Sequence, residues 1–324
     1  MHSLEALREN FLAYMQSQAF CKEPRNLYEP NNYFLQIGGK RLRPVLLLMA
    51  TDLFDGNVQA ALPAALAIEY FHNFSLIHDD VMDGAPLRRN FQTIHEKYNL
   101  NTAILSGDVL LVKAYEYLSK VDDQYFRKVF EVYSKTAVEV CEGQQYDIDF
   151  ETQVEVTHAA YLEMIRLKTA VLLAASMKIG AILGGAGEKD ADLLYEYAEN
   201  LGVAFQIQDD ILDAFGNESL VGKQPGGDII QNKKTLLLIE ALLRSEAEDD
   251  RRLTEIIQAP VTDKAAKVAA VLDIFETYNI RTFALQMRDS YVEKAMSALQ
   301  QLSCAEEGKE ALRQLVNHLV VREF

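Results

Sequence analysis

Apolar residues recur along the chain with helical spacing, and no alternating strand pattern of any length interrupts them. One long helix is predicted from Thr157, a plausible N-cap, to the glycine pair at 184–185, and another is predicted over residues 190–215. Further helices, some of them broken, are predicted at residues 4–18, 33–53, 59–83, 103–119, 125–147, 234–245, 263–298 and 307–321. The pattern therefore predicts an all-α fold.

The chain carries no clear boundary between domains. No stretch rich in Ser, Pro or Gly divides it, and it contains seven prolines. The best candidate boundary, GGAGEKD at residues 184–190, is a short turn between two predicted helices. We therefore predict a single domain over residues 1–324, with two chemically unusual, exposed loops at residues 84–92 and 215–234.

The charge and hydropathy of the chain limit its partners. The formal net charge is -16 and the pI is near 4.9, so the whole molecule repels nucleic acid and anionic membrane surfaces. An anionic ligand would need a local basic cluster. Residues 169–187 approach transmembrane length, but Lys178 lies at their centre, and we predict a buried core helix and no stable membrane insertion.

The cysteines and the N-terminus both indicate a cytoplasmic protein. Cys21, Cys141 and Cys304 are odd in number and far apart, which fits a reducing compartment better than a disulfide scaffold. The first ten residues carry Glu5 and Arg8 where a signal peptide would need an apolar core, so no export is predicted.

Three aspartates form a DDxxD motif at the end of an apolar helical stretch: Asp79, Asp80 and Asp83. On a helix, positions i and i+4 lie on one face and i+1 is rotated by about 100°. The three carboxylates should therefore converge at one helix end. A chain of this composition and length contains a DDxxD by chance about one time in ten, so a single copy is equally well explained as a solvated acidic turn.

The motif occurs twice, because Asp209, Asp210 and Asp213 repeat it. Each copy has an isoleucine two residues before its first aspartate and two apolar residues inside it. The aspartate pairs at residues 122–123 and 249–250 have an apolar residue where the third aspartate would fall, and we expect both at the surface. The repeat makes a functional site the better explanation for the two complete motifs.

Six carboxylates brought together would repel one another unless cations lay between them. Their oxygens suit Mg²⁺, which keeps waters and bridges one or two carboxylates to the phosphates of a ligand. No His/Cys grouping argues for zinc. The hypothesis is a trinuclear or similar magnesium site that receives a diphosphate.

A diphosphate also needs cationic side chains, and the chain has them in compact groups. GGKRLRP at residues 38–44 combines two glycines with three cations, and arginine suits bidentate phosphate contacts. Taken singly, such groups are more often solvated basic turns. His72 lies two helical turns before Asp79 on the same face, where it could be a core residue or a ligand. The basic residues outside that group are Arg88, Arg89, Lys168, Lys223, Lys233 and Lys234.

Together these motifs resemble the trans-prenyl diphosphate synthase (polyprenyl synthetase) family. The resemblance runs from about Gly38 to Thr235 and rests on GGKRLRP, His72, HDDVMD followed by RR, Gly107-Asp108, GQQYD, Lys168-Thr169, FQIQDDILD and GGDIIQNKKT. It implies a helical bundle of the isoprenoid synthase type with a central apolar cavity, and a homodimer.

The resemblance also implies roles for individual residues. Three Mg²⁺ ions per active site would be held by Asp79, Asp80, Asp83 and Asp209, with Asp210 and Asp213 in support. The allylic diphosphate would be contacted by Arg88, Lys168, Thr169, Gln206, Lys223 and Lys233. Isopentenyl diphosphate would be bound by Lys40, Arg43, His72 and Arg89.

The reaction implied is head-to-tail condensation of isopentenyl diphosphate with an allylic diphosphate. The growing tail would run along the helix below Asp79, past Ser75, Phe74 and Phe71, until a bulky side chain stops it. On spacing alone, the two phenylalanines are equally well explained as core. The resemblance favours a short product, C15 to C20, with geranylgeranyl diphosphate preferred and farnesyl diphosphate next.

The chain departs from the family pattern at two turns, where Asn90 and Asn232 stand in place of glycine. Asparagine tolerates left-handed backbone, so we expect both turns to survive. Two other functions remain open at this point. A terpene cyclase would share the first DDxxD and use an allylic diphosphate alone, whereas a non-catalytic partner subunit or a metal-buffering protein would turn over neither substrate.

Overall fold

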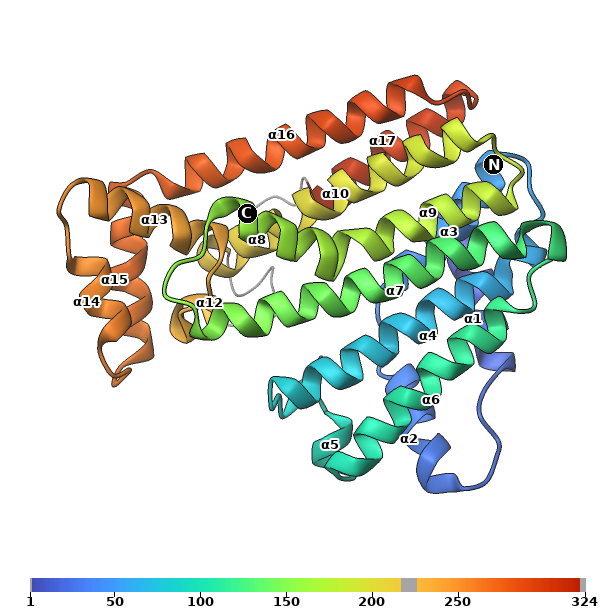
Figure 1. Cartoon of the computed structure of the whole chain (residues 1–324), viewed down its shortest axis with the longest axis horizontal. Coiled ribbons are helices and arrows are strands. Elements are labelled where there is room, and N and C mark those ends of the chain that lie inside the picture. Colours follow the sequence, from blue (N-terminus) through green and yellow to red (C-terminus); the bar gives the residue numbers. More distant parts are fainter. Residues whose placement is uncertain (1, 217–225, 321–324) are drawn as a thin grey trace. The chain divides into compact units, whose positions relative to one another are not determined.

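The computed structural model describes residues 2–216 and 226–320. In these residues the secondary structure is helical apart from one small antiparallel hairpin of β1 (Leu87–Arg88) and β2 (Phe91–Gln92) (Figure 1). The prediction of an all-α fold is confirmed. The helices are α1 (Leu4–Ser17), α2 (Arg25–Gln36), α3 (Leu42–Leu53), α4 (Val58–Met82), α5 (Ile94–Lys97), α6 (Leu100–Leu118), α7 (Asp123–Thr152), α8 (His158–Ile165), the π-helical segment η1 (Arg166–Ala170), α9 (Val171–Leu183), α10 (Glu188–Phe215), α12 (Gly227–Gln231), α13 (Leu236–Ala247), α14 (Arg252–Gln258), α15 (Lys264–Thr277), α16 (Ile280–Gln301) and α17 (Glu306–Val320).

Two predicted helices are broken by left-handed backbone. The helix predicted over residues 33–53 divides into α2 and α3, because Gly38, Gly39 and Arg41 all have positive φ angles, of 89°, 135° and 49°. The helix predicted over residues 263–298 divides into α15 and α16 at Asn279, whose φ is 52°. A left-handed residue cannot continue a right-handed helix, and neither break shows in the spacing of apolar residues.

The chain folds into two compact units. The first comprises Met1–Ala137 and Ala175–Asp192, and the second comprises Val138–Ala174 and Leu193–Phe324. Three of the long helices, α7, α9 and α10, contribute residues to both. The prediction of a single domain over residues 1–324 stays a prediction.

The first unit is built around α4. Nearly every residue of α4 from Ala61 to Phe71 is buried, as expected of a helix that neighbours cover on all sides, and α3 and α6 pack against it (Figure 1). Part of α9 approaches α3 so closely that a Cβ at Gly180 would collide with the backbone of Leu47. Thr51 seals this contact by donating to the carbonyl oxygen of Gly180 at 3.1 Å.

The core helix predicted within residues 169–187 is confirmed as α9, which ends at Leu183 and is almost wholly buried. Lys178 reaches its edge to pair with Asp192, at an Nζ to Oδ1 distance of 2.5 Å. No described helix has both the length and the apolar character that crossing a membrane requires.

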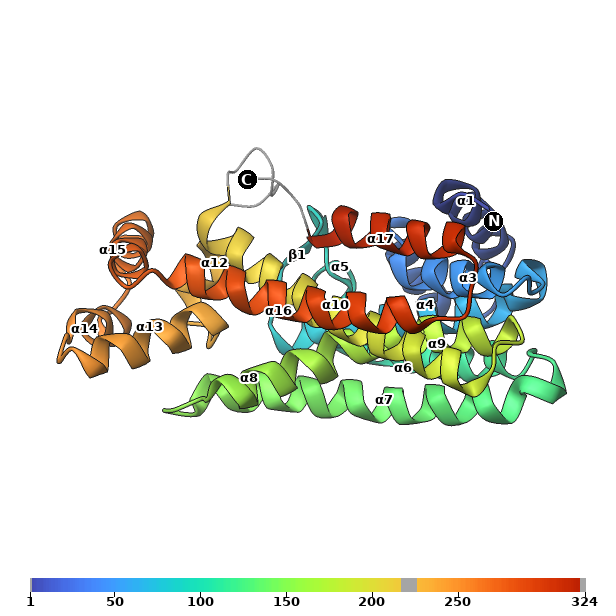
Figure 2. The same ribbon diagram turned by 90° about the horizontal axis from the view of Figure 1, so that it is seen from above.

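The second unit has its own core, formed by buried residues of α8, α10, α13, α15 and α16. At one end of this unit α13, α14 and α15 pack together, and Figure 2 shows the three gathered beyond α12. The short α12 packs against α15. These C-terminal helices lie after the last recognised motif in the sequence, yet they support the loop that carries it.

Candidate functional site

The first aspartate motif lies at the C-terminal end of α4. Asp79 and Asp80 occupy its last turn, and Asp83 follows its last residue and donates its backbone N–H to the carbonyl of Asp79 at 2.9 Å. A helix C-terminus carries partial negative charge, so carboxylates there are unfavourable unless cations compensate them. The three aspartates thus stand at one helix end, as predicted, whereas convergence of their carboxylates on a metal ion stays a prediction.

The hairpin after α4 supplies the first cation. Its two-residue turn, Arg89 and Asn90, has φ angles of 52° and 67°, as a type I′ turn requires. The left-handed backbone predicted for Asn90 is confirmed. The hairpin directs Arg88 back to the aspartates, where its Nε lies 2.9 Å from both carboxylate oxygens of Asp80 and its Nη2 lies 3.3 Å from Oδ2 of Asp79.

Asp80 is the most enclosed of the three aspartates, with its side chain 2% exposed. Burial raises the pKa of Asp80, and the hydrogen bonds and charge of Arg88 oppose that rise. Without Arg88 this carboxylate would be a buried, uncompensated charge. Arg88 therefore neutralises the charge of one aspartate of the first motif.

A basic loop lies beside the hairpin. Arg89 donates to the carbonyl of Gly38, and a Cβ at Gly39 would collide with the Arg89 guanidinium. Gly39 therefore allows an arginine of the same site to lie against the backbone. Lys40 lies exposed in this loop, between α2 and α3.

The two arginines that follow in the loop have different environments. Arg41 is buried and forms an ion pair with Glu69, which also accepts from the Asn73 amide at 2.8 Å. Arg41 therefore holds the start of α3 in place through a buried ion pair. The sequence grouped it with Arg43, but a buried, paired guanidinium cannot bind a ligand.

Arg43 and His72 form a pair, with Nη1 and Nε2 separated by 3.2 Å. Burial, together with the positive charges of Arg43 and three further arginines, lowers the pKa of His72 well below its ordinary value, so the ring is neutral and accepts from Arg43. Burial lowers the pKa of Arg43 to about 10, which leaves it charged at neutral pH. Its Nε is buried and has no hydrogen-bond partner among the described residues. The pair therefore keeps a donor for an anion.

An aromatic series continues down α4 from the aspartates. The rings of Phe74 and His78 lie 4.8 Å apart, those of Phe71 and Phe74 lie 5.6 Å apart, and Tyr133 of α7 follows Phe71 at 5.7 Å. Ser75 donates to the carbonyl of His72 at 2.9 Å. Phe71 is buried, whereas Phe74 is partly exposed. Tyr133 has no signal in the sequence, since it belongs to a different helix and to no motif.

The second motif lies on α10, and its environment differs. Asp210 is buried, with one oxygen accepting from the Tyr161 hydroxyl and the other from the Gln206 amide at 3.3 Å. Burial, and next the charge of Asp228, raise the pKa of Asp210 to about 7. Sequence analysis missed Tyr161, and it gave no role to Asp228 although Asp228 stands inside the GGDIIQNKKT motif.

Asp213, the third aspartate of this motif, holds the next helix. Its Oδ2 accepts from the backbone N–H of Asp228 at 2.9 Å, and its carbonyl accepts from that of Gly226 at 2.6 Å. These bonds fix the start of α12 against α10. The metal-binding role of Asp213 stays a prediction.

Lys168 and Thr169 lie in the π-helical segment between α8 and α9. Such bulges are frequent at functional sites because they displace side chains from the regular helical pattern. A Cβ at Gly143 would collide with the backbone of Lys168, which explains the glycine of the GQQYD motif. Lys168 pairs with Asp147 of the same motif at 2.5 Å, and the hydroxyl of Thr169 lies 3.5 Å from Oε1 of Gln206.

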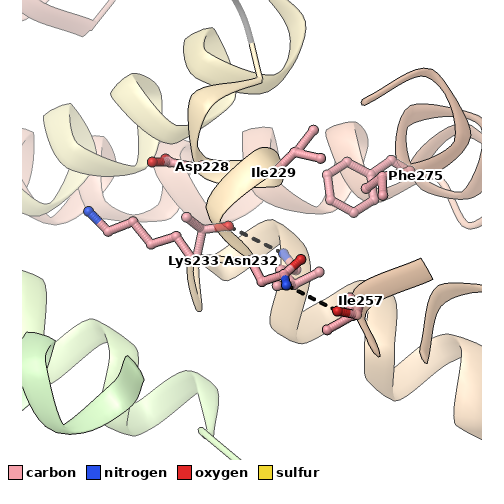
Figure 3. A pocket seen from close by; sticks show the side chains of 9 residues that line it. Asp228, Ile229, Asn232, Lys233, Ile257 and Phe275 are labelled. Atoms are coloured by element: carbon pink, nitrogen blue, oxygen red, sulfur yellow. Dashed lines mark hydrogen bonds between the residues drawn. The ribbon is translucent and has the colours of Figure 1, made fainter. Parts of the chain in front are cut away.

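Lys233 follows α12 and lines a small pocket with an apolar base (Figure 3). Asn232, the residue before it, has a φ of 55°, so the left-handed backbone predicted there is confirmed. Lys223 lies outside the described residues. The other residues that line the pocket are Asp228, Ile229, Asn232, Thr235, Leu238, Ile257, Val271 and Phe275.

The described residues contain no group of three His, Cys, Asp or Glu side chains placed to hold a metal ion by themselves. Mg²⁺ does not require such a cage, since it is commonly held by one or two carboxylates, waters and the phosphates of a substrate. The donor set is chemically suitable, because the motifs offer hard carboxylate oxygens. Asp122, Asp123 and Asp249 lie at the surface, as predicted. The surface position predicted for Asp250 is wrong, because its side chain is 15% exposed and accepts from Arg252 and Tyr278.

The fold and the two carboxylate sites define a class, the all-α isoprenoid synthases. The polyprenyl synthetase family model matches residues 24–275, and the chain belongs to that family. A geranylgeranyl diphosphate synthase of Methanosarcina mazei is 40% identical over 304 residues, covering 93% of this chain and 91% of that protein.

Solved structures agree with this assignment. A crystal structure of a geranylgeranyl pyrophosphate synthase matches with a TM-score of 0.94 and 41% identity, covering 100% of both chains. A polyprenyl synthase of Caulobacter crescentus CB15, solved as a complex with calcium and isoprenyl diphosphate, matches with a TM-score of 0.84 and 28% identity, covering 99% of this chain and 98% of that chain.

Proposed function

We propose that the chain is a short-chain trans-prenyltransferase. It condenses isopentenyl diphosphate head-to-tail with allylic diphosphates to give products of C15 to C20, with geranylgeranyl diphosphate favoured over farnesyl diphosphate. The family and the names of its relatives support this activity.

One observation carries the proposal: α4 joins two kinds of recognition on a single helix. Its last turn presents Asp79 and Asp80, and about one to two turns below them Phe74 and Phe71 form an aromatic series. A substrate with an anionic head and a hydrocarbon tail matches that order. A metal-buffering protein would need the carboxylates but would have no use for the aromatic face.

The proposed cofactor is Mg²⁺, three ions per active site. When bound, the ions would neutralise the diphosphate and favour its departure from the allylic carbon. Binding of metal and isoprenyl diphosphate together in the Caulobacter crescentus relative supports this part of the proposal. The proposed ligands are Asp79, Asp80, Asp83, Asp209, Asp210 and Asp213.

The other side chains bind and orient the two substrates. Arg43, with its free buried Nε, and neutral His72 would hold isopentenyl diphosphate together with Lys40 and Arg89. The allylic diphosphate would contact Arg88, Lys168, Thr169, Gln206, Lys223 and Lys233. No side chain is assigned as a base, and the released diphosphate would accept the proton lost after carbon–carbon bond formation.

The proposed state is a cytoplasmic homodimer. Exposed apolar side chains on α6, Ile104, Leu105 and Val112, would suit burial against a second copy, and Val112 is 65% exposed. All three cysteines are free thiols, as expected in a reducing compartment.

The decisive assay uses the purified protein with isopentenyl diphosphate, Mg²⁺ and each allylic starter in turn, with products sized by mass spectrometry. Products one or more C5 units longer than the starter, ending at C20, are expected, and EDTA should abolish them. Consumption of the starter without isopentenyl diphosphate would establish a cyclase instead. No turnover of any starter would establish the non-catalytic alternative.

The same assay tests the floor of the tail path. Phe74→Ala removes a ring that lies partly exposed above Phe71, so products should lengthen beyond those of the wild type by at least one C5 unit. Phe126→Ala, an aromatic change on α7 outside any motif, is the control and should leave the distribution unchanged. An identical product distribution for Phe74→Ala and wild type would exclude Phe74 as the floor.

A further inference from the structure

The short helix before Lys233 ends in a Schellman turn. The backbone N–H of Lys233 donates to the carbonyl of Asp228 at 2.9 Å, and that of Asn232 donates to the carbonyl of Ile229 at 3.2 Å. This pair of bonds, with a left-handed residue at Asn232, is the motif that glycine usually completes. The turn itself would form equally well with glycine at position 232.

Asparagine adds two hydrogen bonds that glycine cannot make. Its Oδ1 accepts from Nζ of Lys267 at 2.6 Å, and its Nδ2 donates to the carbonyl of Ile257 at 3.2 Å. Figure 3 shows the side chain of Asn232 directed to Ile257 while that of Lys233 points to the opposite side, towards Asp228. Asn232 therefore attaches the turn to neighbouring elements, while the adjacent Lys233 directs its side chain away from them.

Lys267 completes the attachment from α15. The residue is 8% exposed, and its ammonium group also donates to the carbonyl of Ile230 at 3.1 Å. Ile230 is in the last turn of α12, where carbonyls lack partners within the helix, so a cation there is favourable. The same helix meets the start of α12, since a Cβ at Gly226 would collide with Val268.

The geometry points to Lys267 as a positioning residue that acts through Asn232 on Lys233, a role that rests on the proposed function of Lys233 in binding the allylic diphosphate. A buried lysine is costly to desolvate, and both hydrogen bonds described for the Lys267 ammonium group go to α12 and its C-cap, at Ile230 and Asn232. Ile230 belongs to α12 and Asn232 is the left-handed residue that ends it. The Lys267 ammonium group therefore holds both the helix and the turn that follows it.

The test separates positioning from general stability. Lys267→Met keeps the aliphatic stem and removes the ammonium group, whereas Lys267→Arg restores a cationic donor. We expect Lys267→Met to raise KM for the allylic diphosphate about tenfold, because displacement of a binding group by ~1 Å can cost as much as ~10²-fold. KM for isopentenyl diphosphate should stay within about twofold of the wild type, since its proposed ligands lie elsewhere.

Two further variants and one binding measurement accompany this experiment. Lys264→Met, an exposed lysine on the same helix, is the matched control and should change neither KM. Asn232→Gly keeps the turn but removes the two side-chain bonds, and it should reproduce the effect of Lys267→Met even if that variant fails to fold. Binding of inorganic pyrophosphate with Mg²⁺, measured by calorimetry, should weaken in parallel with the allylic KM.

The outcomes distinguish this inference from the proposed function. If the wild type is active and Lys233→Ala raises the allylic KM while Lys267→Met and Asn232→Gly do not, the positioning role is wrong and the function stands. Equal changes in both KM values would also overturn it, because they would indicate a general structural role. An inactive wild type would overturn the proposed function itself.

Discussion

The end of α4 and the matching stretch of α10 both carry a DDxxD motif, but the buried aspartate of each motif has partners of different charge. On α4, Asp80 is held by a charged partner, the guanidinium of Arg88. On α10, Asp210 is held by neutral donors, the hydroxyl of Tyr161 and the amide of Gln206. Arg88 compensates its carboxylate within the protein, whereas the α10 carboxylate lies near a further acid, Asp228.

This difference shows what each motif needs in order to work. A carboxylate paired with arginine has its charge compensated without metal, so the first motif holds part of its counter-charge before any ligand binds. A carboxylate that is bonded only to a hydroxyl and an amide has no compensating charge, so an added cation stabilises its ionised form more strongly. We infer that the two motifs respond differently to loss of charge, to pH and to removal of metal.

The largest expected effect comes from removing charge on the first motif. Asp80→Asn leaves the Arg88 guanidinium without its main partner and should lower the free energy of unfolding by ~3 kcal/mol, as loss of one member of a buried pair does. It should also lower kcat/KM about 10³-fold, because a preorganised charge at the diphosphate site is lost. Chemical denaturation and steady-state kinetics measure the two effects.

The control for this prediction is Asp249→Asn. Asp249 is exposed and has a φ of 54°, which asparagine also adopts readily. Its free energy of unfolding should stay within ~0.5 kcal/mol of the wild type. A loss in Asp80→Asn no greater than in this control would show that the Arg88 pair contributes nothing.

In the second motif, replacing the buried aspartate by asparagine should raise the free energy of unfolding, by an amount that depends on pH. The pKa of Asp210 is about 7 in the folded protein, against ~3.9 for an unfolded aspartate, so the native state holds an extra proton between these values. The free energy of unfolding therefore falls as pH rises through that window. Asp210→Asn removes this titration and should be more stable than the wild type by ~4 kcal/mol at pH ~8 but nearly equal to it at pH ~4.

Denaturation in EDTA at several pH values measures that difference, and EDTA is essential because a bound cation would favour the ionised carboxylate. Other titrating groups cancel in the comparison between variant and wild type. Parallel stability curves for the two proteins would show that Asp210 is ionised in the native state at neutral pH, contrary to the burial argument.

A smaller effect is expected from the neutral partner itself. Tyr161→Phe removes one hydrogen bond to Asp210 and should lower kcat/KM about tenfold, the loss expected for a bond to an ionised group. The Mg²⁺ concentration for half-maximal rate should rise as well. Tyr197→Phe is the control, since the equally buried Tyr197 donates to the backbone carbonyl of Leu312 at 2.8 Å and touches neither motif.

The two tyrosine variants should lose comparable stability, about 1 kcal/mol each, because each loses one buried hydrogen bond. Only Tyr161→Phe should change the metal dependence. A shift in the Mg²⁺ requirement of both variants, or of neither, would show that the hydroxyl of Tyr161 has no specific effect on the second motif.

The sequence predicted those features that depend on neighbouring residues. Helical spacing indicated most helices, and the aspartate and basic motifs indicated where charge would occur. It also predicted left-handed backbone at Asn90 and Asn232, which the structure has. These inferences succeed because turn chemistry and helix periodicity are local.

The sequence could not indicate features that depend on contacts between distant residues. Tyr161 reaches Asp210 across 49 positions, and Tyr133 meets Phe71 from another helix. The pattern GGKRLRP does not distinguish buried Arg41 from Arg43, because the difference depends on Glu69. The π-helical segment at Lys168 likewise packs closely against Gly143 of another helix, a contact that no local pattern indicates.

The two asparagines at glycine positions provide the smallest and most direct comparison between the two regions. Asn232 makes two side-chain hydrogen bonds, whereas the side chain of Asn90 is exposed and makes none that is described among residues 2–216 and 226–320. Glycine is preferred at the second position of a type I′ turn, because left-handed backbone costs an asparagine more. Asn90→Gly should therefore raise the free energy of unfolding by ~0.5 kcal/mol without changing activity, whereas Asn232→Gly should lower it by ~1 kcal/mol. Denaturation of both variants under one condition measures the pair, and effects of the same sign would mean that the Asn232 contacts contribute no net stability.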